Sequence, residues 1–221
     1  ADILGHDAAR KICILASLCF GKHVYPDFVE TEGITNITPE DVEYAKNYGK
    51  VIKLLGTAMR SPDDKVSAEV SPALIDATGP LANVNDVFNA VLVDGNAVGE
   101  VVFYGKGAGK EATASAVVAD MMDCIKHIDA RKYLYWEDGD NDYVDMGYDP
   151  ETRLFVVIRS DDFDGLVSQF NEIFGSDTKC VKSKENCEIA FITEKDKASK
   201  IQEKLSLFKN GIAVKTLKTM L

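Results

Sequence analysis

The stretch Asp2-Ile3-Leu4-Gly5-His6-Asp7-Ala8-Ala9-Arg10-Lys11 opens an apolar segment that continues to Phe20. Apolar residues recur along it at helical spacing, which predicts a helix that begins near Asp7 and is mostly buried. The expected buried residues are Ala8, Ile12, Leu15 and Cys19, with Cys13, Ala16 and Phe20 beside them. Asp7 is expected to cap the helix, because a short carboxylate accepts hydrogen bonds from open backbone amides and suits the positive end of the helix dipole.

Asp7 and Lys11 stand four residues apart, so both head groups can point from one helix face toward a common spot. On spacing alone, the simpler interpretation is an ordinary surface ion pair, which stabilises a helix little. The residue types around the pair favour a second interpretation, in which the acid holds a lysine in place for chemistry.

These residue types form the pattern Asp-apolar-x-Gly-x-Asp-x-x-x-Lys. Its fixed places are occupied by Asp2, Ile3, Gly5, Asp7 and Lys11. The pattern is similar to the second half of the homoserine dehydrogenase signature. Two later segments also resemble that family, Glu32-Gly33-Ile34 with Ile37-Thr38 and Asp41, and Gly49 with Ile52-Lys53-Leu54-Leu55. Because the nucleotide-binding domain of the family normally precedes this pattern, the resemblance implies that the chain is a C-terminal fragment of a longer enzyme.

The resemblance implies an NAD(P)-dependent oxidoreductase that interconverts L-homoserine and L-aspartate 4-semialdehyde in threonine, methionine and isoleucine biosynthesis. It assigns Lys11 as the general acid/base and Asp2 and Asp7 as substrate-binding carboxylates. A lysine on a rigid helix suits this role, because reducing a carbonyl needs a proton source held at its oxygen. The fragment alone is expected to be inactive, because the main binding domain for NAD or NADP is missing. The resemblance also implies a homodimer.

A second glycine-rich segment, residues 105–117, follows a predicted strand and opens a predicted helix. Taken alone, its Gly-x-Gly-x-x-Ala run over residues 107–112 mimics a dinucleotide-binding fingerprint. We reject that interpretation, because the preceding strand is predicted to pair in a hairpin and no convincing second strand carries the acidic residue that the fingerprint requires. The backbone amides of such a turn still form a slot that a ligand can approach closely.

The same segment is similar to a glycine-rich turn of homoserine dehydrogenases. This resemblance implies that Gly107, Ala108 and Gly109 bind the cofactor beside the nicotinamide, and that helix 113–127 packs on the nucleotide domain. Without that domain, the apolar face of this helix is expected to be exposed or buried in a contact between copies.

The charge balance excludes some classes of partner. The 221 residues include 36 acids and 25 bases, a net charge of −11. Nucleic acids and anionic membranes require clustered Lys and Arg, so neither is an expected partner. We find no signal peptide and no apolar run long enough to span a bilayer, so the sequence predicts a cytoplasmic protein.

The cysteines and histidines predict no metal site. None of the five cysteines forms a Cys-x-x-Cys pair. Cys13, Cys19 and Cys124 lie in apolar runs and are expected to be buried thiols in a reducing compartment. The three histidines have no ligand partners at the spacing that zinc requires.

Residues 1–128 predict an α+β domain for substrate binding and dimerisation. Thr38 and Pro39 predict a helix start, as the N-cap and the first helical residue. Strands are predicted at 51–60, 65–70, 87–93 and 97–104, the last two forming a hairpin around Asp94-Gly95-Asn96. Strands in succession predict a mixed, largely antiparallel sheet covered by helices.

Residues 129–150 are predicted to form an acidic linker, with a short aromatic strand at Tyr133-Leu134-Tyr135-Trp136. A calcium loop would need a glycine where Tyr143 stands and a glutamate where Asp149 stands. The alternative, a solvated acidic loop, is the simpler interpretation.

Residues 151–221 predict a ferredoxin-like domain of βαββαβ order. The expected elements are strand 154–158, helix 162–174, strands 179–182 and 187–193, helix 198–208 and strand 212–217. The order resembles an ACT domain, which implies either amino-acid sensing or a plain dimer contact. Threonine is the candidate effector, with Asp162 and Gly165 in the turn that the family uses.

A second class of function stays open, a non-catalytic module that senses amino acids or mediates dimerisation. It is favoured if Lys11→Ala leaves the turnover of the complete enzyme intact while threonine still binds the tail.

Overall fold

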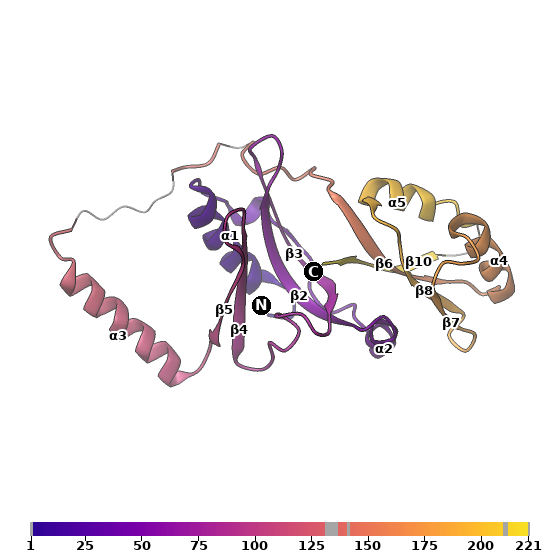
Figure 1. Cartoon of the computed structure of the whole chain (residues 1–221), viewed down its shortest axis with the longest axis horizontal. Coiled ribbons are helices and arrows are strands. Elements are labelled where there is room, and N and C mark those ends of the chain that lie inside the picture. The colour runs from indigo at the N-terminus through magenta and orange to yellow at the C-terminus, as the bar shows by residue number, and fades with distance from the viewer. Residues whose placement is uncertain (1, 131–136, 141, 210–211, 221) are drawn as a thin grey trace. The chain divides into compact units, whose positions relative to one another are not determined.

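The computed structural model describes residues 2–130, 137–140, 142–209 and 212–220. These residues form two compact units, one made of residues 1–76 and 135–221 and the other of residues 77–134. Figure 1 shows the elements of both. The predicted aromatic strand at 133–136 lies outside the described residues.

The first part of the larger unit is a long β-hairpin with a helix on it. Its elements are α1 (His6–Phe20), η1 (Pro26–Phe28), β1 (Glu30–Thr31), α2 (Pro39–Asn47), β2 (Lys50–Arg60) and β3 (Val66–Asp76). Strands β2 and β3 pair antiparallel over their whole length, and the short β1 pairs parallel with β3. Helix α1 packs on this hairpin through Ala9, Cys13 and Ala16, which are buried with Val66, Ala68 and Val70 of β3.

The predicted buried face of α1 is confirmed except at Cys19, because Cys13 and Ala16 are buried and Ala8, Ile12, Leu15 and Phe20 are partly buried. Ala9, Cys13 and Ala16 are buried, whereas Cys19 is exposed and Ile14 and Leu18 are about half exposed. From residue 12 to residue 20 every position except Ser17 is apolar, so the pattern alone did not exclude Cys19 from the buried face. Small side chains on the buried face let the helix approach the hairpin closely. Cys124 is also exposed, so the expectation of three buried thiols holds only for Cys13.

The tail has the predicted βαββαβ order. Its elements are β6 (Glu151–Arg159), α4 (Phe163–Phe174), β7 (Cys180–Ser183), β8 (Glu188–Ile192), the two-residue β9 (Asp196–Lys197), α5 (Ala198–Leu205) and β10 (Ile212–Thr219). The strands follow the spatial order β10-β6-β8-β7, all antiparallel, as expected of a split βαβ fold. Strand β10 also pairs in parallel with β3, so the tail and the first hairpin share one sheet.

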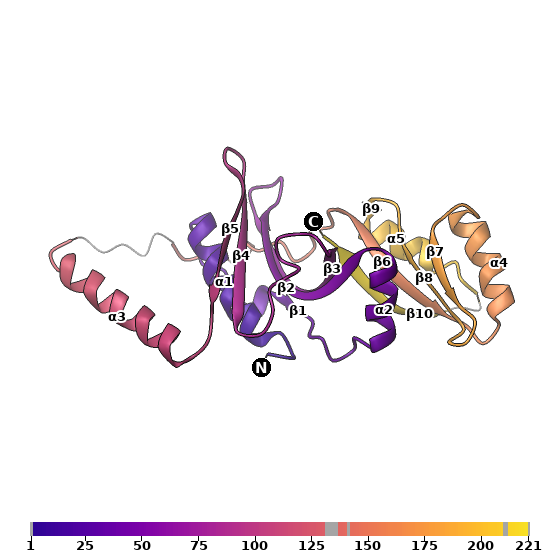
Figure 2. The same ribbon diagram turned by 60° about the horizontal axis from the view of Figure 1, so that its bottom comes forward.

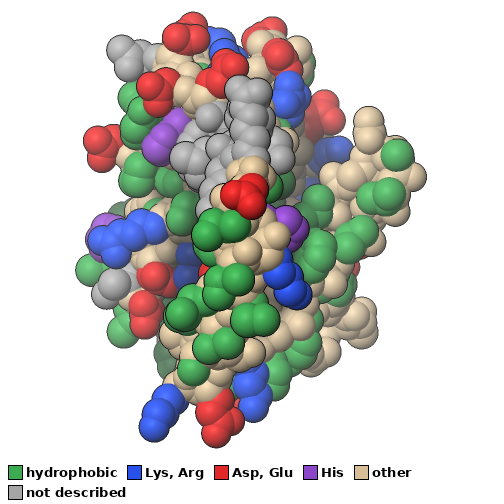
Figure 3. All heavy atoms as spheres, turned by 90° about the vertical axis from the view of Figure 1, so that its left-hand side faces the viewer, with side chains coloured by type: hydrophobic (Ala, Val, Ile, Leu, Met, Phe, Trp, Pro, Cys, Tyr) green, Lys and Arg blue, Asp and Glu red, His purple; other side chains and the backbone are tan. Residues whose placement is uncertain are grey.

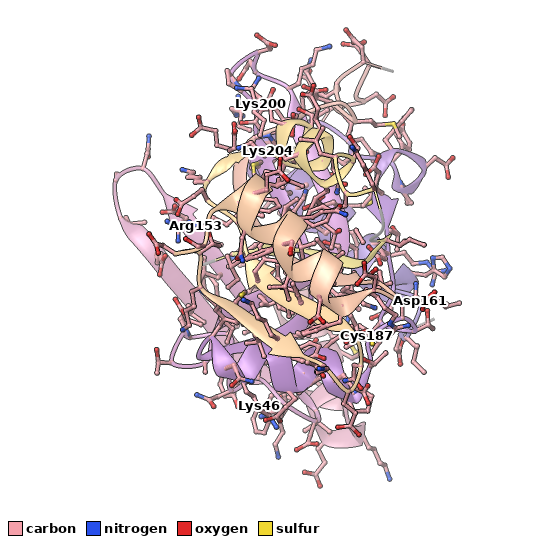
Figure 4. All side chains as sticks on the ribbon, turned by 90° about the vertical axis from the view of Figure 1, so that its right-hand side faces the viewer. Lys46, Arg153, Asp161, Cys187, Lys200 and Lys204 are labelled. Atoms are coloured by element: carbon pink, nitrogen blue, oxygen red, sulfur yellow. The ribbon has the colours of Figure 1, made fainter. Side chains whose placement is uncertain are left out.

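Both faces of the tail sheet are covered. Alternate residues of β6 point to opposite faces. Leu154, Val156 and Ile158 pack with α4 and α5, whereas Phe155 and Val157 pack with Tyr44 and Ala45 of α2. Figures 2 and 4 show α2 on the side of the sheet away from α4 and α5, and Figure 4 labels Lys46 on α2 and Lys204 on α5. Helix α2, from the first part of the chain, therefore completes the core of the tail.

Hydrogen bonds anchor α2 at this position. Thr38 caps the helix as predicted, because its hydroxyl accepts the Asp41 amide while Asp41 accepts the Thr38 amide. The Tyr44 hydroxyl donates to buried Glu188 over 2.8 Å, and Tyr48 donates to the carbonyl oxygen of Ala190 over 3.1 Å.

The acidic segment after residue 136 is anchored rather than merely solvated. Tyr143 and Val144 are buried in the same core as α1, and the Val66 amide donates to the Tyr143 carbonyl. The residue that breaks the calcium-loop pattern thus has a packing role. Among the described residues, no group of three or more His, Cys, Asp or Glu side chains is arranged to hold a metal ion.

The smaller unit consists of a hairpin and a helix. Strands β4 (Phe88–Gly95) and β5 (Gly99–Lys106) pair antiparallel, and α3 (Lys110–Lys126) follows. The turn lies at residues 96–98 rather than the predicted 94–96, because Gly95 still pairs with Gly99. Apolar side chains of α3 are exposed, among them Val117, Val118, Met121, Met122 and Ile125. Figure 3 shows hydrophobic side chains along α3.

The predicted fold class, a mixed and largely antiparallel sheet with helices followed by a ferredoxin-like arrangement, is confirmed. The division at residues 128 and 150, and the likeness of the tail to an ACT domain, stay predictions. No helix among the described residues is long and apolar enough to cross a bilayer.

Candidate functional site

A tight turn places the quoted motif at the start of α1. The Gly5 amide donates to the Asp2 carbonyl over 3.0 Å, and Gly5 is the N-cap of α1 with φ of 80°. This left-handed conformation favours glycine, which explains why the pattern has a glycine here. Asp7 therefore lies in the first helical turn and does not cap the helix by its side chain, so the predicted capping role is wrong.

Asp7 and Lys11 form the ion pair that their spacing predicts. The Lys11 Nζ lies 2.8 Å from the Asp7 Oδ2, and their side chains are 58% and 44% exposed. The hydrogen bond from Lys11, together with its charge, lowers the pKa of Asp7 below its usual value. Asp2 is exposed on the preceding turn. The two acids and the lysine thus belong to one accessible stretch of ten residues.

Removing the lysine is expected to raise the pKa of Asp7 toward its ordinary value, because the main cause of the lowering is lost. Titration of the Asp7 carboxylate carbon by NMR in Lys11→Met against the unaltered chain measures the change. Because the pKa of Asp7 is lower in the folded chain than in the unfolded chain, the pair stabilises the fold at any pH above the unfolded-state pKa. This stabilisation is lost as the pH falls through the folded-state pKa of Asp7. An unchanged pKa would mean that the pair does not persist in solution.

A second segment of the chain lies against the turn. The Ile34 amide donates to the Ile3 carbonyl over 2.9 Å, and the Glu32 amide donates to the Val70 carbonyl of β3 over 2.7 Å. Residues 30–34 therefore connect the turn to the sheet. The sequence signal was the run Glu32-Gly33-Ile34, which resembles the family but does not by itself indicate that this segment lies against residues 2–5.

The glycine bend at Gly107, Ala108 and Gly109 belongs to the smaller unit. The Gly107 amide donates to the Val87 carbonyl over 2.9 Å, and a Cβ on Gly107 would lie 3.0 Å from the Asn89 Cβ. Gly109 is the N-cap of α3 with φ of 114°, makes no side-chain capping bond and would have no atom within 4 Å of a Cβ. The bend is held by the hairpin, and the first amides of α3 stay open, since a helix leaves them without intrahelical partners.

The two effector candidates of the tail lie together, joined by a helix cap. The Asp162 carboxylate accepts the Gly165 amide over 2.9 Å at the start of α4, and a Cβ on Gly165 would lie 2.7 Å from the Asp162 Cγ. The preceding residue, Asp161, lies beside the β7–β8 turn at Cys187, where the Ser160 amide donates to the Cys187 carbonyl over 3.1 Å (Figure 4).

The motif at the start of α1 and the fold around it match one family. A family model described as homoserine dehydrogenase matches residues 1–122. The chain belongs to the homoserine dehydrogenase family.

Relatives of known name support the assignment. The homoserine dehydrogenase of Pseudomonas aeruginosa is 48% identical over 125 residues, which is 57% of this chain and 29% of that protein. The homoserine dehydrogenase of Mycobacterium tuberculosis is 41% identical over 178 residues, covering 76% of this chain and 39% of that protein. The matched segments of the chain thus cover well under half the length of these homoserine dehydrogenases.

Solved structures of homoserine dehydrogenases share the fold. The structure of the Thiobacillus denitrificans enzyme superposes with a TM-score of 0.83 at 31% identity, covering 99% of this chain and 54% of that one. A Staphylococcus aureus homoserine dehydrogenase superposes with a TM-score of 0.76 at 28% identity, covering the whole chain and 54% of that one. The likeness therefore extends through the tail as well as the first 122 residues.

Proposed function

We propose that this chain supplies the substrate-binding part of a homoserine dehydrogenase, which interconverts L-homoserine and L-aspartate 4-semialdehyde with NAD or NADP in amino-acid biosynthesis. The observation that carries the proposal is the Asp7–Lys11 pair, 2.8 Å between charged atoms, on a helix start held by a left-handed glycine. The family model that matches residues 1–122, and the identity of the chain to named homoserine dehydrogenases, support it.

In the proposed mechanism, the Lys11 ammonium donates a proton to the oxygen of the semialdehyde carbonyl, and the neutral amine takes it back from the homoserine hydroxyl. Asp7 holds the Lys11 Nζ by the ion pair, which limits the directions in which the proton can be delivered. The Asp2 and Asp7 carboxylates attract the ammonium group of the substrate, because both carry negative charge at the same helix start.

The open amides at Gly109 and the first turn of α3 fit an electron-rich group of a dinucleotide cofactor. A Cβ at Gly109 would meet no atom within 4 Å, and the helix start carries partial positive charge. Gly107, Ala108 and Gly109 would hold the nicotinamide end. When bound, the nicotinamide accepts or gives the hydride that the reaction requires.

The test compares two proteins. The 221-residue chain alone is expected to give no turnover of L-homoserine with NAD or NADP, whereas the complete enzyme that contains it is expected to reduce the nicotinamide. The absorbance of the reduced cofactor measures both. Turnover by the 221 residues alone would contradict the proposal that they supply only the substrate-binding part. A complete enzyme that cannot oxidise L-homoserine would contradict the proposed function.

The tail supports a second role, sensing an amino acid or joining two copies in a homodimer. The βαββαβ order favours an ACT-like module, but this rests on analogy of fold. The Asp162 carboxylate is already occupied as the cap of α4, so an effector would have to displace the Gly165 amide or bind beside it. Calorimetry of the chain with L-threonine tests sensing. A binding heat at millimolar L-threonine would support this site if Asp162→Asn abolishes that heat. No binding heat would count against the site.

A further inference from the structure

Two glycines outside the quoted motif lie close to its backbone, each in a different segment of the chain. Gly33 lies in the segment after β1, and Gly56 lies near the middle of β2. Both positions carry the backbone of one segment close to the stretch that holds Asp2, Asp7 and Lys11.

The approach at Gly33 leaves no room for a side chain. A Cβ there would lie 2.7 Å from the Leu4 Cα and nearer still to the Ile3 carbonyl oxygen. Both are backbone atoms, so the contact cannot be relieved by rotating a side chain. The same approach allows the Ile34 amide to donate to the Ile3 carbonyl over 2.9 Å. Any residue larger than glycine must therefore push the turn at residues 2–5 away from the segment.

The approach at Gly56 is milder and acts on the helix itself. A Cβ there would lie 3.2 Å from the Ile12 Cβ and 3.6 Å from the Ala8 carbonyl oxygen. Ala8 and Ile12 flank Lys11 on the same turns of α1. A methyl group on Gly56 would move the helix by a few tenths of an ångström, rather than displace the turn.

We propose that Gly33 and Gly56 are positioning residues for the reaction, which set the distance between the sheet and the Asp2–Lys11 stretch by having no side chain. This inference rests on the proposed function, because the position of Lys11 matters only if it transfers a proton. Neither glycine touches the reacting atoms. Both act through the backbone of the turn and of α1.

The position of a proton-transferring group affects catalysis steeply, since a misplacement of about 1 Å can lower the rate about 100-fold. In the complete enzyme, Gly33→Ala is therefore expected to lower kcat about 100-fold while KM for NAD(P) stays unchanged. Gly56→Ala is expected to give a smaller loss of kcat. Gly147→Ala is the matched control, because its Cβ would meet only the Asp145 side chain, at 3.7 Å, and kcat should not change.

Hydrogen exchange of the Ile34 amide in the 221-residue chain reports the geometry without any activity. Gly33→Ala should remove its protection, while the amides of β6, which pairs with β8 and β10, should keep the protection that they have in Gly147→Ala. If Gly33→Ala does not fold, Gly56→Ala carries the kinetic test.

The outcomes separate the two proposals. An inactive unaltered complete enzyme would contradict the proposed function. An active enzyme in which the folded glycine variants keep full kcat would overturn the positioning role alone. Loss of kcat in Gly33→Ala, or in Gly56→Ala where Gly33→Ala does not fold, with Gly147→Ala unaffected, would support it.

Discussion

Replacing Lys11 by methionine in the complete enzyme is expected to lower kcat about 10²–10⁴-fold, the range that general acid–base groups contribute. Methionine keeps the length and apolar stem of lysine but cannot hold the proton. Helix α1 should stay folded, because the Lys11 side chain is 58% exposed and its single ion pair faces solvent.

The matched control is Lys46→Met on α2. Lys46 is 63% exposed and forms a similar ion pair within its helix, with Glu43 at 3.4 Å. Replacing Lys46 by methionine therefore removes the same charge and the same type of contact as Lys11→Met. Its kcat should equal that of the unaltered enzyme. Equal rates in Lys11→Met and Lys46→Met would show that Lys11 is an ordinary surface residue, and would favour the sensing or dimerising module.

The second large effect concerns the core that the two parts of the larger unit share. Phe155 of β6 is fully buried and packs in one cluster with Tyr44 of α2, Leu74 of β3 and Leu217 of β10. Phe155→Ala is expected to lower the free energy of unfolding by about 3–5 kcal/mol, the usual cost of removing a buried phenylalanine side chain. Denaturant unfolding of the 221-residue chain measures it.

Because this cluster joins α2 and β3 to the tail, the loss should appear in one cooperative transition of the larger unit. Leu207→Ala, whose side chain is 58% exposed, is the control and should change the free energy little. Two separate transitions, with only one shifted by Phe155→Ala, would instead support a tail that folds by itself, as the sequence predicted.

Local signals in the sequence predicted the elements well. Thr38 and Pro39 define a helix start by their own chemistry, and β-branched runs around a short turn define β4 and β5. The order of the tail elements was predicted in the same way. The sequence was sufficient to predict a helix, strand or turn wherever its residues have a strong local preference for one of these structures.

Contacts between distant segments were not predictable. Residues 38–48 carry the signal of a helix but not the information that Tyr44 meets Glu188, 144 residues later. The parallel pairing of β10 with β3 has no local signature either. Cys19 was wrongly predicted to be buried for a related reason, since the mostly apolar second half of α1 is oriented by its partner and not by its own pattern.

At the candidate site, the sequence predicted the Asp7–Lys11 pair, because helical spacing is a local property. Gly5 was known only as a fixed place of the family pattern, and its left-handed conformation came from the structure. It did not predict that Gly33 would lie against Leu4, since that approach depends on where β1 pairs with β3. The roles of all the predicted site residues stay proposals, namely Lys11, Asp2, Asp7, Gly107, Ala108, Gly109, Asp162 and Gly165.

The central claim is that Lys11 delivers the proton in homoserine dehydrogenase chemistry. A crystal structure of the complete enzyme with L-homoserine and the oxidised cofactor tests it most directly. We expect the Lys11 Nζ to lie within hydrogen-bonding distance of the substrate hydroxyl oxygen, roughly 2.6–3.2 Å. A substrate hydroxyl bound to another proton-transferring side chain, with Lys11 facing solvent, would contradict it.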